Sequence, residues 1–247
     1  MPHGVFGEFM GTMVLILMGN GVVANVLLKK SKGEGAGWMA ISTGWALAVM
    51  AGVFTAIACG SEGHLNPAVT LGAAVVSGDF SRLAWYTAAQ MAGAIAGACL
   101  VWLNYLPHWP ATPDAGLKRA CFCTAPAIRN PMANLLSEII GTFVLVLVAA
   151  AIFSKAVAAA GPVAGLGPYL VGCVVWGIGL SLGGTTGYAI NPARDLGPRI
   201  AHAILPISNK GFLSRICGAI LALGVVPSCD TGQFPWRRRC ESRRIVW

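Results

Sequence analysis

The sequence predicts an all-α membrane protein, a bundle of transmembrane helices built from two inverted repeats. Three observations predict this class: the composition, the spacing of charges along the chain, and a pair of short motifs that occurs twice. Of the 247 residues, 56% are apolar and only 11% are charged, and the mean hydropathy is +0.69. Soluble domains carry about 25% charged residues. The composition therefore excludes a disordered chain, a coiled coil and most soluble enzymes, and it favours an integral membrane protein.

Long uncharged stretches follow one another along the chain. Four of them are between 20 and 38 residues long, at 9–28, 35–61, 83–113 and 156–193. A spanning helix needs about 20 mostly apolar residues, so each stretch is long enough to hold a crossing. The shorter run at 139–154 also suffices when it is extended back through Glu138 to Asn134. Residues 63–78 are too few to span, and we expect a re-entrant segment there.

Two motifs recur in the same order, which indicates an internal repeat. The segment Glu8-Phe-Met-Gly-Thr12 recurs as Glu138-Ile-Ile-Gly-Thr142, and each opens a long apolar run. Asn66-Pro67-Ala68 recurs as Asn191-Pro192-Ala193, with the asparagines 58 and 53 residues after the respective glutamates. Three crossings per half is an odd number, so the second half must enter the membrane from the opposite side. The special site of such an inverted repeat lies at the repeat interface, near the midplane.

The expected helices follow from these motifs. The first repeat, residues 5–103, should hold crossings near 5–28, 38–59 and 83–103, with a short helix that starts at Pro67. The second repeat, residues 134–227, should hold crossings near 134–154 and 168–182, a short helix from Pro192, and a final crossing after Phe212. The linker 104–133 contains five prolines and is expected to be the longest, exposed loop. The whole chain 1–247 is then expected to form one transmembrane domain.

The end of the chain departs from this pattern. The apolar run 216–226 has only eleven residues, with Arg215 at its edge, which is short for a sixth spanning helix. The tail 228–247 is strongly basic and holds five arginines. One hypothesis is a change of reading frame near residues 208–214, which resequencing of the gene would test.

Asn-Pro-Ala is physically a good helix start. Asparagine is a favoured N-cap, and proline costs nothing at the first helical position, where its missing N–H would have no partner. Both starts follow glycine-rich backbone inside uncharged regions, and such backbone is tolerated at membrane depth only when it is buried in protein or lines a water-filled cavity. Two starts from opposite sides bring two positive helix ends and two amide donors together. The extended segments 60–65 and 184–190 would offer carbonyl acceptors.

A passage with central donors, carbonyl acceptors and positive helix ends suits a small neutral hydroxylic solute and repels cations. A capped helix explains one Asn-Pro-Ala motif, but not two in register. The net charge of +8 does not indicate nucleic-acid binding, because five of the eleven arginines lie in the tail and no basic face with interleaved aromatics occurs. The eight cysteines form no metal pattern and are interpreted as small buried hydrophobes. No metal, cofactor or enzymatic activity is expected.

The segments His64-Leu-Asn-Pro-Ala-Val-Thr70 and Gly187-Tyr-Ala-Ile-Asn-Pro-Ala-Arg-Asp195 resemble the motifs of the major intrinsic protein family, the aquaporins and glycerol facilitators. The resemblance covers most of residues 5–205, and an aspartate after the arginine is typical of the glycerol-conducting branch. It implies six transmembrane helices, two re-entrant half-helices, a pore in each subunit and a homotetramer in the cell (inner or plasma) membrane. It also implies a passive channel for glycerol and related small uncharged solutes, with some water.

The resemblance also assigns the pore residues. The two motifs at the pore centre are Asn66, Pro67, Ala68, Asn191, Pro192 and Ala193, and the selectivity filter is Trp45, Gly179, Tyr188 and Arg194. Trp45 and Tyr188 would form an apolar corner for a carbon backbone, with Arg194 donating to hydroxyls from the opposite side. Gly179 would leave width, and the absence of a histidine near Trp45 favours a polyol over water alone. Packing in the core or at the membrane interface is an equally good explanation of Trp45.

Four ionisable residues are expected to support this site. Glu8 and Glu138 are carboxylates in apolar helices, and their symmetry predicts that each accepts hydrogen bonds from backbone N–H groups of a re-entrant loop; a proton relay is the less favoured alternative. Asp195 is expected to brace the second half-helix near its positive start. His64 is expected to line or support the mouth of the pore, without a metal ion.

Three other functions stay open from the sequence alone: a water-selective aquaporin, a non-conducting membrane protein with the same fold, and an ion-coupled transporter. A coupled carrier would need intramembrane charges at the midplane. The one central charge is Arg194, which disfavours cations.

Overall fold

The computed structural model describes residues 3–157, 162 and 165–210, and every regular element in this part of the chain is a helix. Four helices are long and apolar enough to cross a bilayer: α1 (Val5–Leu27), α2 (Gly37–Ala58), α4 (Leu83–Asn104) and α7 (Pro131–Ile152). Helix α8 (Leu166–Ser181) is apolar but shorter, with 16 residues. The crossing expected after residue 212 and the basic tail lie outside the described residues.

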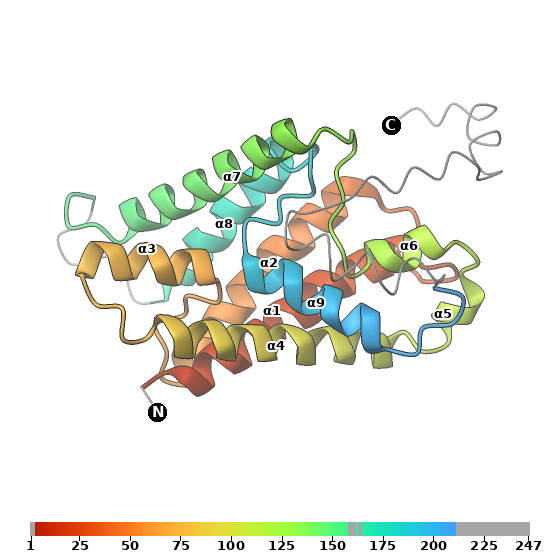
Figure 1. Ribbon diagram of the computed structural model, residues 1–247, viewed down its shortest axis with the longest axis horizontal. Coiled ribbons are helices and arrows are strands. Elements are labelled where there is room, and N and C mark those ends of the chain that lie inside the picture. Colours follow the sequence, from red (N-terminus) through yellow and green to blue (C-terminus); the bar gives the residue numbers. More distant parts are fainter. Residues whose placement is uncertain (1–2, 158–161, 163–164, 211–247) are drawn as a thin grey trace.

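Two short helices, α3 (Pro67–Ser77) and α9 (Pro192–Ile204), begin at the two Asn-Pro-Ala motifs. In each, the asparagine is an N-cap in an extended conformation and the proline is the first helical residue, as the sequence predicts. In Figure 1 the two helices lie in line with their N-terminal ends toward each other, and α4 packs along both. The expected pair of half-helices is therefore present in the fold.

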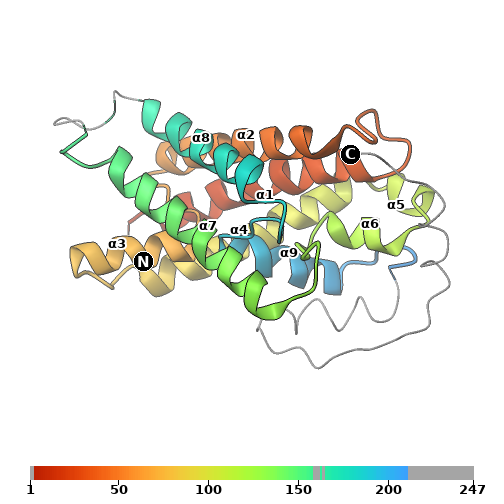
Figure 2. The same cartoon turned by 90° about the horizontal axis from the view of Figure 1, so that it is seen from above.

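The first repeat is tightly packed because glycines let its helices approach closely. Helix α1 lies against both α2 and α4. A Cβ atom on Gly11 would come within 2.6 Å of the Gly52 carbonyl oxygen of α2, and one on Gly97 would come within 2.4 Å of the Met13 carbonyl oxygen of α1. Helix α8 then packs along α2, and α7 packs beside α8 (Figure 2). The second repeat thus joins the first through α2 and through the half-helices.

Helix α7 begins three residues before the expected position 134. The side chain of Asn130 accepts a hydrogen bond from the Ala133 backbone N–H at 3.2 Å, and Pro131 occupies the first helical position. This is a further asparagine–proline helix start. The sequence therefore contained a signal for this boundary in the two residues before the apolar run.

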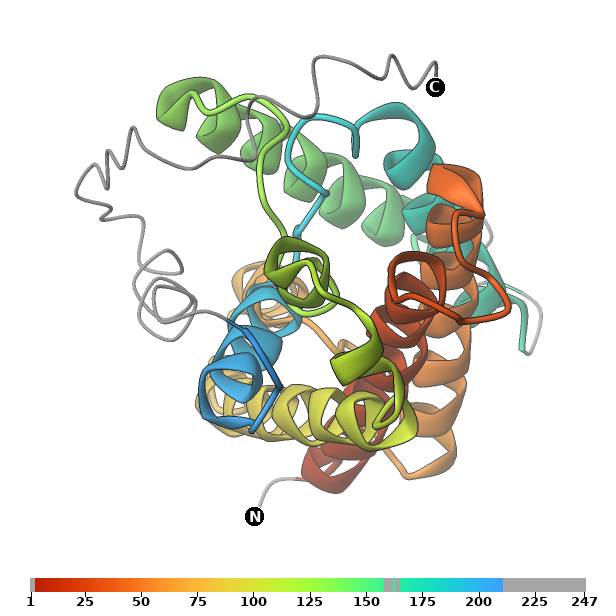
Figure 3. The same cartoon turned by 90° about the vertical axis from the view of Figure 1, so that its right-hand side faces the viewer.

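The linker between the repeats is exposed over much of its length, as the sequence predicts, but it is not a loop throughout. It forms two short helices, α5 (His108–Ala111) and α6 (Ala115–Ala120), which cover one end of the bundle (Figure 3). The rings of Trp109 and Phe122 are buried and lie in series with His202 of α9, with centroids 5.6 Å apart at each step. Prolines divide the linker into short pieces, but burial of its aromatic side chains fixes these pieces to the bundle.

The cysteines of the described residues are free thiols. Cys121 and Cys123 of the linker are buried, and burial raises the pKa of the Cys123 thiol to about 11. Both therefore behave as small apolar side chains at neutral pH. Cys59, Cys99 and Cys173 are half-buried on the bundle helices, less than the sequence predicts.

Candidate functional site

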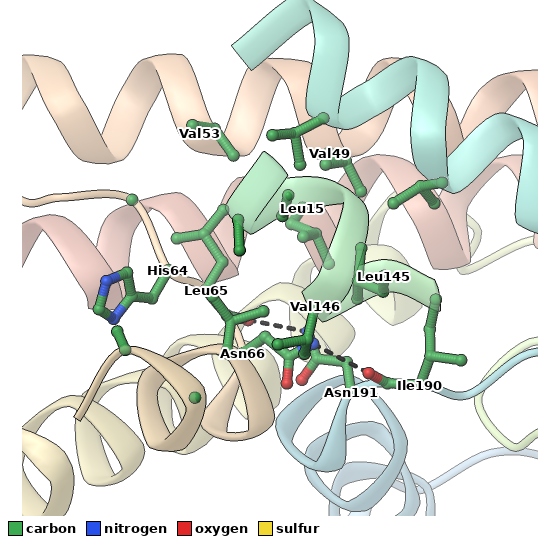
Figure 4. A pocket seen from close by; sticks show the side chains of 18 of the residues that line it. Leu15, Val49, Val53, His64, Leu65, Asn66, Leu145, Val146, Ile190 and Asn191 are labelled. Carbon is green, nitrogen blue, oxygen red and sulfur yellow. Dashed lines mark hydrogen bonds between the residues drawn. The ribbon is translucent and has the colours of Figure 1, made fainter. Parts of the chain in front are cut away.

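A cavity of about 650 Å³ lies between the two repeats and is lined by residues of both. This volume falls within the range of small-molecule sites, about 300–1,000 Å³. The walls are mostly apolar, and their polar side chains are few: Glu62, His64, Asn66, Ser154, Tyr188, Asn191 and Arg194. Figure 4 shows Asn66 and Asn191 next to each other, with Val49 and Val53 of α2 across the cavity.

The two asparagines are fixed by reciprocal hydrogen bonds across the repeat interface. The Asn66 side-chain nitrogen donates to the Ile190 carbonyl at 2.9 Å, and the Asn191 nitrogen donates to the Leu65 carbonyl at 2.8 Å. Each side-chain oxygen accepts a backbone N–H from the first turn of its own half-helix. An amide nitrogen carries two hydrogens. The bond across the interface uses one of them, so the second is available to the cavity that both residues line.

The residue before each asparagine has an unusual backbone conformation. Leu65 has φ of 52° and Ile190 has φ of 40°, in the left-handed region that residues with side chains rarely adopt. The carbonyls of these two residues accept the reciprocal asparagine bonds. The sequence predicts extended segments that offer their carbonyls to a solute; Leu65 and Ile190 are not extended, and one acceptor site of each of their carbonyls is used by the opposite asparagine. Strained backbone of this kind persists only where the surrounding structure holds it.

Glu8 holds the first strained loop. Its side chain is fully buried, and its carboxylate accepts the backbone N–H of His64 at 2.9 Å and of Leu65 at 2.7 Å. It also accepts the Ser61 hydroxyl at 2.5 Å and the Gln90 side-chain amide at 2.7 Å. These four donors engage both carboxylate oxygens, which favours the structural role over a proton relay. Ser61 and Gln90 are polar residues that the sequence analysis did not select.

Glu138 holds the second strained loop in the same way. Its carboxylate accepts the backbone N–H of Ala189 at 3.1 Å and of Ile190 at 2.9 Å. The side chain is half-buried, in contrast to the fully buried Glu8. The two symmetric glutamates therefore lie where the repeat predicts, each bonded to the backbone just before an asparagine.

Three of the four expected filter residues, Trp45, Tyr188 and Arg194, line one end of the cavity. The guanidinium carbon of Arg194 lies 4.1 Å from the centre of a Trp45 ring. The expected placement of the arginine opposite both aromatic side chains is therefore wrong. A planar cation is attracted to the face of an indole ring, and the two side chains form one wall together.

Gly179 and Tyr188 form a unit of their own. A Cβ atom on Gly179 would lie 3.0 Å from the Tyr188 ring, so the glycine makes room for this ring. Gly179 is behind the ring and does not itself line the cavity. Its expected effect on the width of the filter is thus indirect, through the position that it permits Tyr188 to take.

The structure combines the two explanations of Trp45. The side chain is only 3% exposed, and a Cβ atom on Gly19 of α1 would overlap its ring. It is therefore packed in the core on one side. It also lines the cavity and carries the Arg194 contact on the other.

Asp195 lies in the first turn of α9, as expected, and it has hydrogen-bond partners both in α9 and in the linker. Its carboxylate accepts two hydrogen bonds from Arg199 at 2.8 and 2.9 Å, and it accepts the Thr124 hydroxyl at 2.6 Å. Arg199 also donates to the Thr124 carbonyl at 2.7 Å. Asp195 therefore ties the second half-helix to the linker. The sequence gives no signal for this contact, because Thr124 lies 71 positions away.

His64 lies away from the filter, beside the start of α3. One ring nitrogen is 3.3 Å from the Thr70 hydroxyl, and the other is 3.5 Å from the Glu62 carboxylate. His64 and Glu62 both line the cavity. Glu62 also forms an ion pair with Arg82. Among the described residues, no cluster of three or more potential metal ligands occurs.

A family model described as Major intrinsic protein matches residues 2–226. A protein of Thermotoga maritima named "Probable glycerol uptake facilitator protein" is 56% identical over 205 residues, which cover 82% of this chain and 85% of that protein. "Glycerol uptake facilitator protein 3" of Lactiplantibacillus plantarum is 56% identical over 209 residues, 84% of each chain. The X-ray structure of the aquaglyceroporin from Plasmodium falciparum matches with a TM-score of 0.74 at 27% identity, covering 89% of this chain and 91% of that chain.

Proposed function

The chain belongs to the major intrinsic protein family, and from this premise we propose that it is a passive channel for glycerol and related small uncharged solutes, with some water. It is a multi-pass integral membrane protein and not an enzyme. The observation that carries the proposal is the reciprocal asparagine pair, which brings amide donors from two opposed helix starts to one cavity.

The cavity suits an amphipathic solute. Asn66 and Asn191 supply donors on one side, while Val49 and Val53 supply an apolar surface across from them. An extended polyol can direct its hydroxyls to one side and its C–H groups to the other. It therefore exchanges hydrogen bonds with water for hydrogen bonds with the channel, and its carbon atoms leave water at no polar cost.

The same cavity disfavours cations. The N-terminal ends of α3 and α9 carry partial positive charge, and Arg194 adds a full charge at the filter end. A cation would lose its hydration among mostly apolar walls and meet positive potential at two places. A neutral solute meets neither barrier.

The proposed pore residues are the two Asn-Pro-Ala motifs and the filter made by Trp45, Gly179, Tyr188 and Arg194. Glu8, Glu138, Asp195 and His64 support them through the contacts described above. The chain acts in this proposal as one channel domain, and the assembly that the family resemblance implies is a homotetramer with a pore in each subunit.

Stopped-flow light scattering on proteoliposomes tests this function. We expect glycerol and water fluxes above those of empty vesicles, with a low activation energy and no ion current. Substitution of an asparagine, Asn66→Ala or Asn191→Ala, should reduce both fluxes, and Met132→Leu, at a 76% exposed position of α7, should not. Water flux without glycerol flux would support a water-selective channel. No flux above empty vesicles would support a non-conducting membrane protein.

A further inference from the structure

Trp38, near the start of α2, contacts two of the four filter positions. Its indole N–H donates to the Gly179 carbonyl at 3.0 Å. Its ring meets the Tyr188 ring edge to face, with centroids 5.8 Å apart and an angle of 83° between the planes. No sequence motif contains Trp38, and 141 positions separate it from Gly179.

The acceptor that Trp38 uses lies in the last turn of α8, which ends at Ser181. The last four carbonyls of a helix have no partner within the helix. The carbonyl of Gly179 is one of these four, and the Trp38 N–H satisfies it. Trp38 therefore attaches the end of α8 to α2 at the level of the filter.

Tyr188 depends on its neighbours for its position. Its backbone has φ of 38°, a conformation that the surroundings must hold. On one side its ring packs on α8 and the turn that follows, where Cβ atoms on Gly179 and Gly183 would lie only 3.0 and 2.4 Å from it. On another side it meets the edge of Trp38. Glycines provide room but no directional contact, so Trp38 supplies an orienting aromatic contact for this ring.

Helix α2 carries both Trp38 and Trp45, which are seven residues, or about two turns, apart and so share one face of the helix. Trp45 forms one wall of the filter with Arg194. Through Trp38, the same helix also contacts Tyr188, a third residue that lines the cavity. A single helix thus contacts both the Trp45–Arg194 pair and the Tyr188 ring.

We propose that Trp38 is a positioning residue of the selectivity filter, which fixes the position of the Tyr188 ring in the cavity that Trp45 and Arg194 also line, and thereby the size of solute admitted. The inference rests on the proposed channel function and deepens it. Without the indole, the end of α8 loses its bond to α2 and the Tyr188 ring can shift away from the filter. The aperture then widens, and the flux of larger polyols rises relative to the flux of glycerol.

The test compares proteoliposome fluxes of water, glycerol and the five-carbon polyol ribitol. Trp38→Ala is expected to raise the ribitol-to-glycerol flux ratio about three-fold or more, since selection among homologous solutes depends on close fit. Trp38→Phe keeps a ring but loses the N–H and should raise the ratio less. The matched control is Trp85→Ala, which removes a 50% exposed tryptophan near the start of α4 and should leave the ratio unchanged.

The outcomes separate this inference from the channel function. Wild-type glycerol flux with unchanged ratios in the Trp38 variants would overturn the inference alone. An equal fall of all three fluxes in a folded Trp38→Ala protein would also overturn it, because it would indicate a merely structural role. If Trp38→Ala does not fold, Trp38→Phe carries the same comparison. Absence of glycerol flux in the wild type would overturn the proposed function and this inference together.

Discussion

The loops before Asn66 and Asn191 have the same backbone arrangement but different supports. In both, a left-handed residue turns its carbonyl to the opposite asparagine, and two N–H groups bind a glutamate. The first loop is held within its own repeat, by Glu8 of α1 together with Gln90 of α4. The second is followed by a half-helix that Asp195 ties to the linker. The backbone of the two loops is therefore the symmetric part of the site. The two halves of the site differ in the residues that support and surround these loops.

The two repeats differ most in chemistry at the residue that follows the Asn-Pro-Ala motif. In the first repeat it is the apolar Val69, and in the second it is Arg194, which contacts Trp45. Duplication explains why two helix starts meet, but it does not explain selection among solutes. The charge of Arg194, which is absent at Val69, and the aromatic side chains of Trp45 and Tyr188 are the features that can select.

The largest expected effect is on stability, and it should differ between substitutions of Glu8 and Glu138. Glu8→Ala leaves four donors without this acceptor: the backbone N–H groups of His64 and Leu65, the Ser61 hydroxyl and the Gln90 amide. An unsatisfied buried donor costs about 1–3 kcal/mol. Glu138→Ala also frees two N–H groups, but at a half-buried site, so its cost should be smaller. Thermal unfolding in detergent measures the difference. Glu8→Gln keeps an acceptor oxygen, so its unfolding temperature should lie between those of the wild type and Glu8→Ala.

Equal losses from Glu8→Ala and Glu138→Ala would show that burial does not separate the two supports. The comparison would then reduce to the backbone N–H groups, two of which are freed in each loop, and the further bonds of Glu8 to Ser61 and Gln90 would add nothing measurable.

The sequence predicts the helices and the pair of half-helices well, because long apolar runs and repeated helix starts are local signals. It misses the two short helices of the linker, where five prolines suggest a loop. Burial of Trp109 and Phe122 against α9 decides the outcome there. That burial depends on a helix far along the chain, and no local pattern encodes it.

The candidate site divides in the same way. Glu8 and Glu138 are predictable, since a carboxylate in an apolar helix needs donors and the repeat shows which loop supplies them. Gln90 and Thr124 are not predictable, because tertiary packing brings them to Glu8 and Asp195 from 82 and 71 positions away. The stacking of Arg194 on Trp45 needs the relative position of α2 and α9, which the motifs leave open.

The next largest effect on stability concerns Asp195, which bonds the second half-helix to the linker. Asp195→Asn leaves Arg199, whose side chain is only 8% exposed, without its ion-pair partner. Removing one partner of a buried pair costs about 3–5 kcal/mol, and the remaining bonds to Thr124 favour the lower end of this range. A drop in the unfolding temperature measures the effect. The exposed control Asp79→Asn, beyond the end of α3, should shift it far less.

The double variant Asp195→Asn with Arg199→Met sharpens this prediction. If an unpaired charge causes the loss, the double variant should be more stable than Asp195→Asn alone. Additive losses would contradict the ion-pair explanation and assign the effect to packing against the linker.

A smaller effect, on ion exclusion, tests the chemical difference between the halves. Arg194→Val makes the second helix start resemble the first, where Val69 follows the motif. Loss of the charge removes part of the barrier to cations, and about 1–2 kcal/mol corresponds to a roughly 5- to 30-fold rise in ion leak. Conductance across planar bilayers measures the leak. An unchanged conductance would mean that the half-helix ends exclude cations without the arginine.

The smallest expected effect is on the unfolding temperature and concerns Glu34, in the loop between α1 and α2 of the first repeat. This loop lies outside the membrane. The Lys29 ammonium donates to the Glu34 carboxylate at 2.6 Å and the Lys30 backbone N–H donates at 2.8 Å, and these bonds lower the pKa of Glu34 below its usual 4.5. A carboxyl group whose pKa is lower in the folded state stabilises the fold above its unfolded pKa, and this contribution disappears as the pH falls through the folded value. The difference in unfolding temperature between the wild type and Glu34→Gln should therefore be small and constant above pH 5 and should shrink toward zero below about pH 4. A difference that grew on acidification would mean that the carboxylate destabilises the loop.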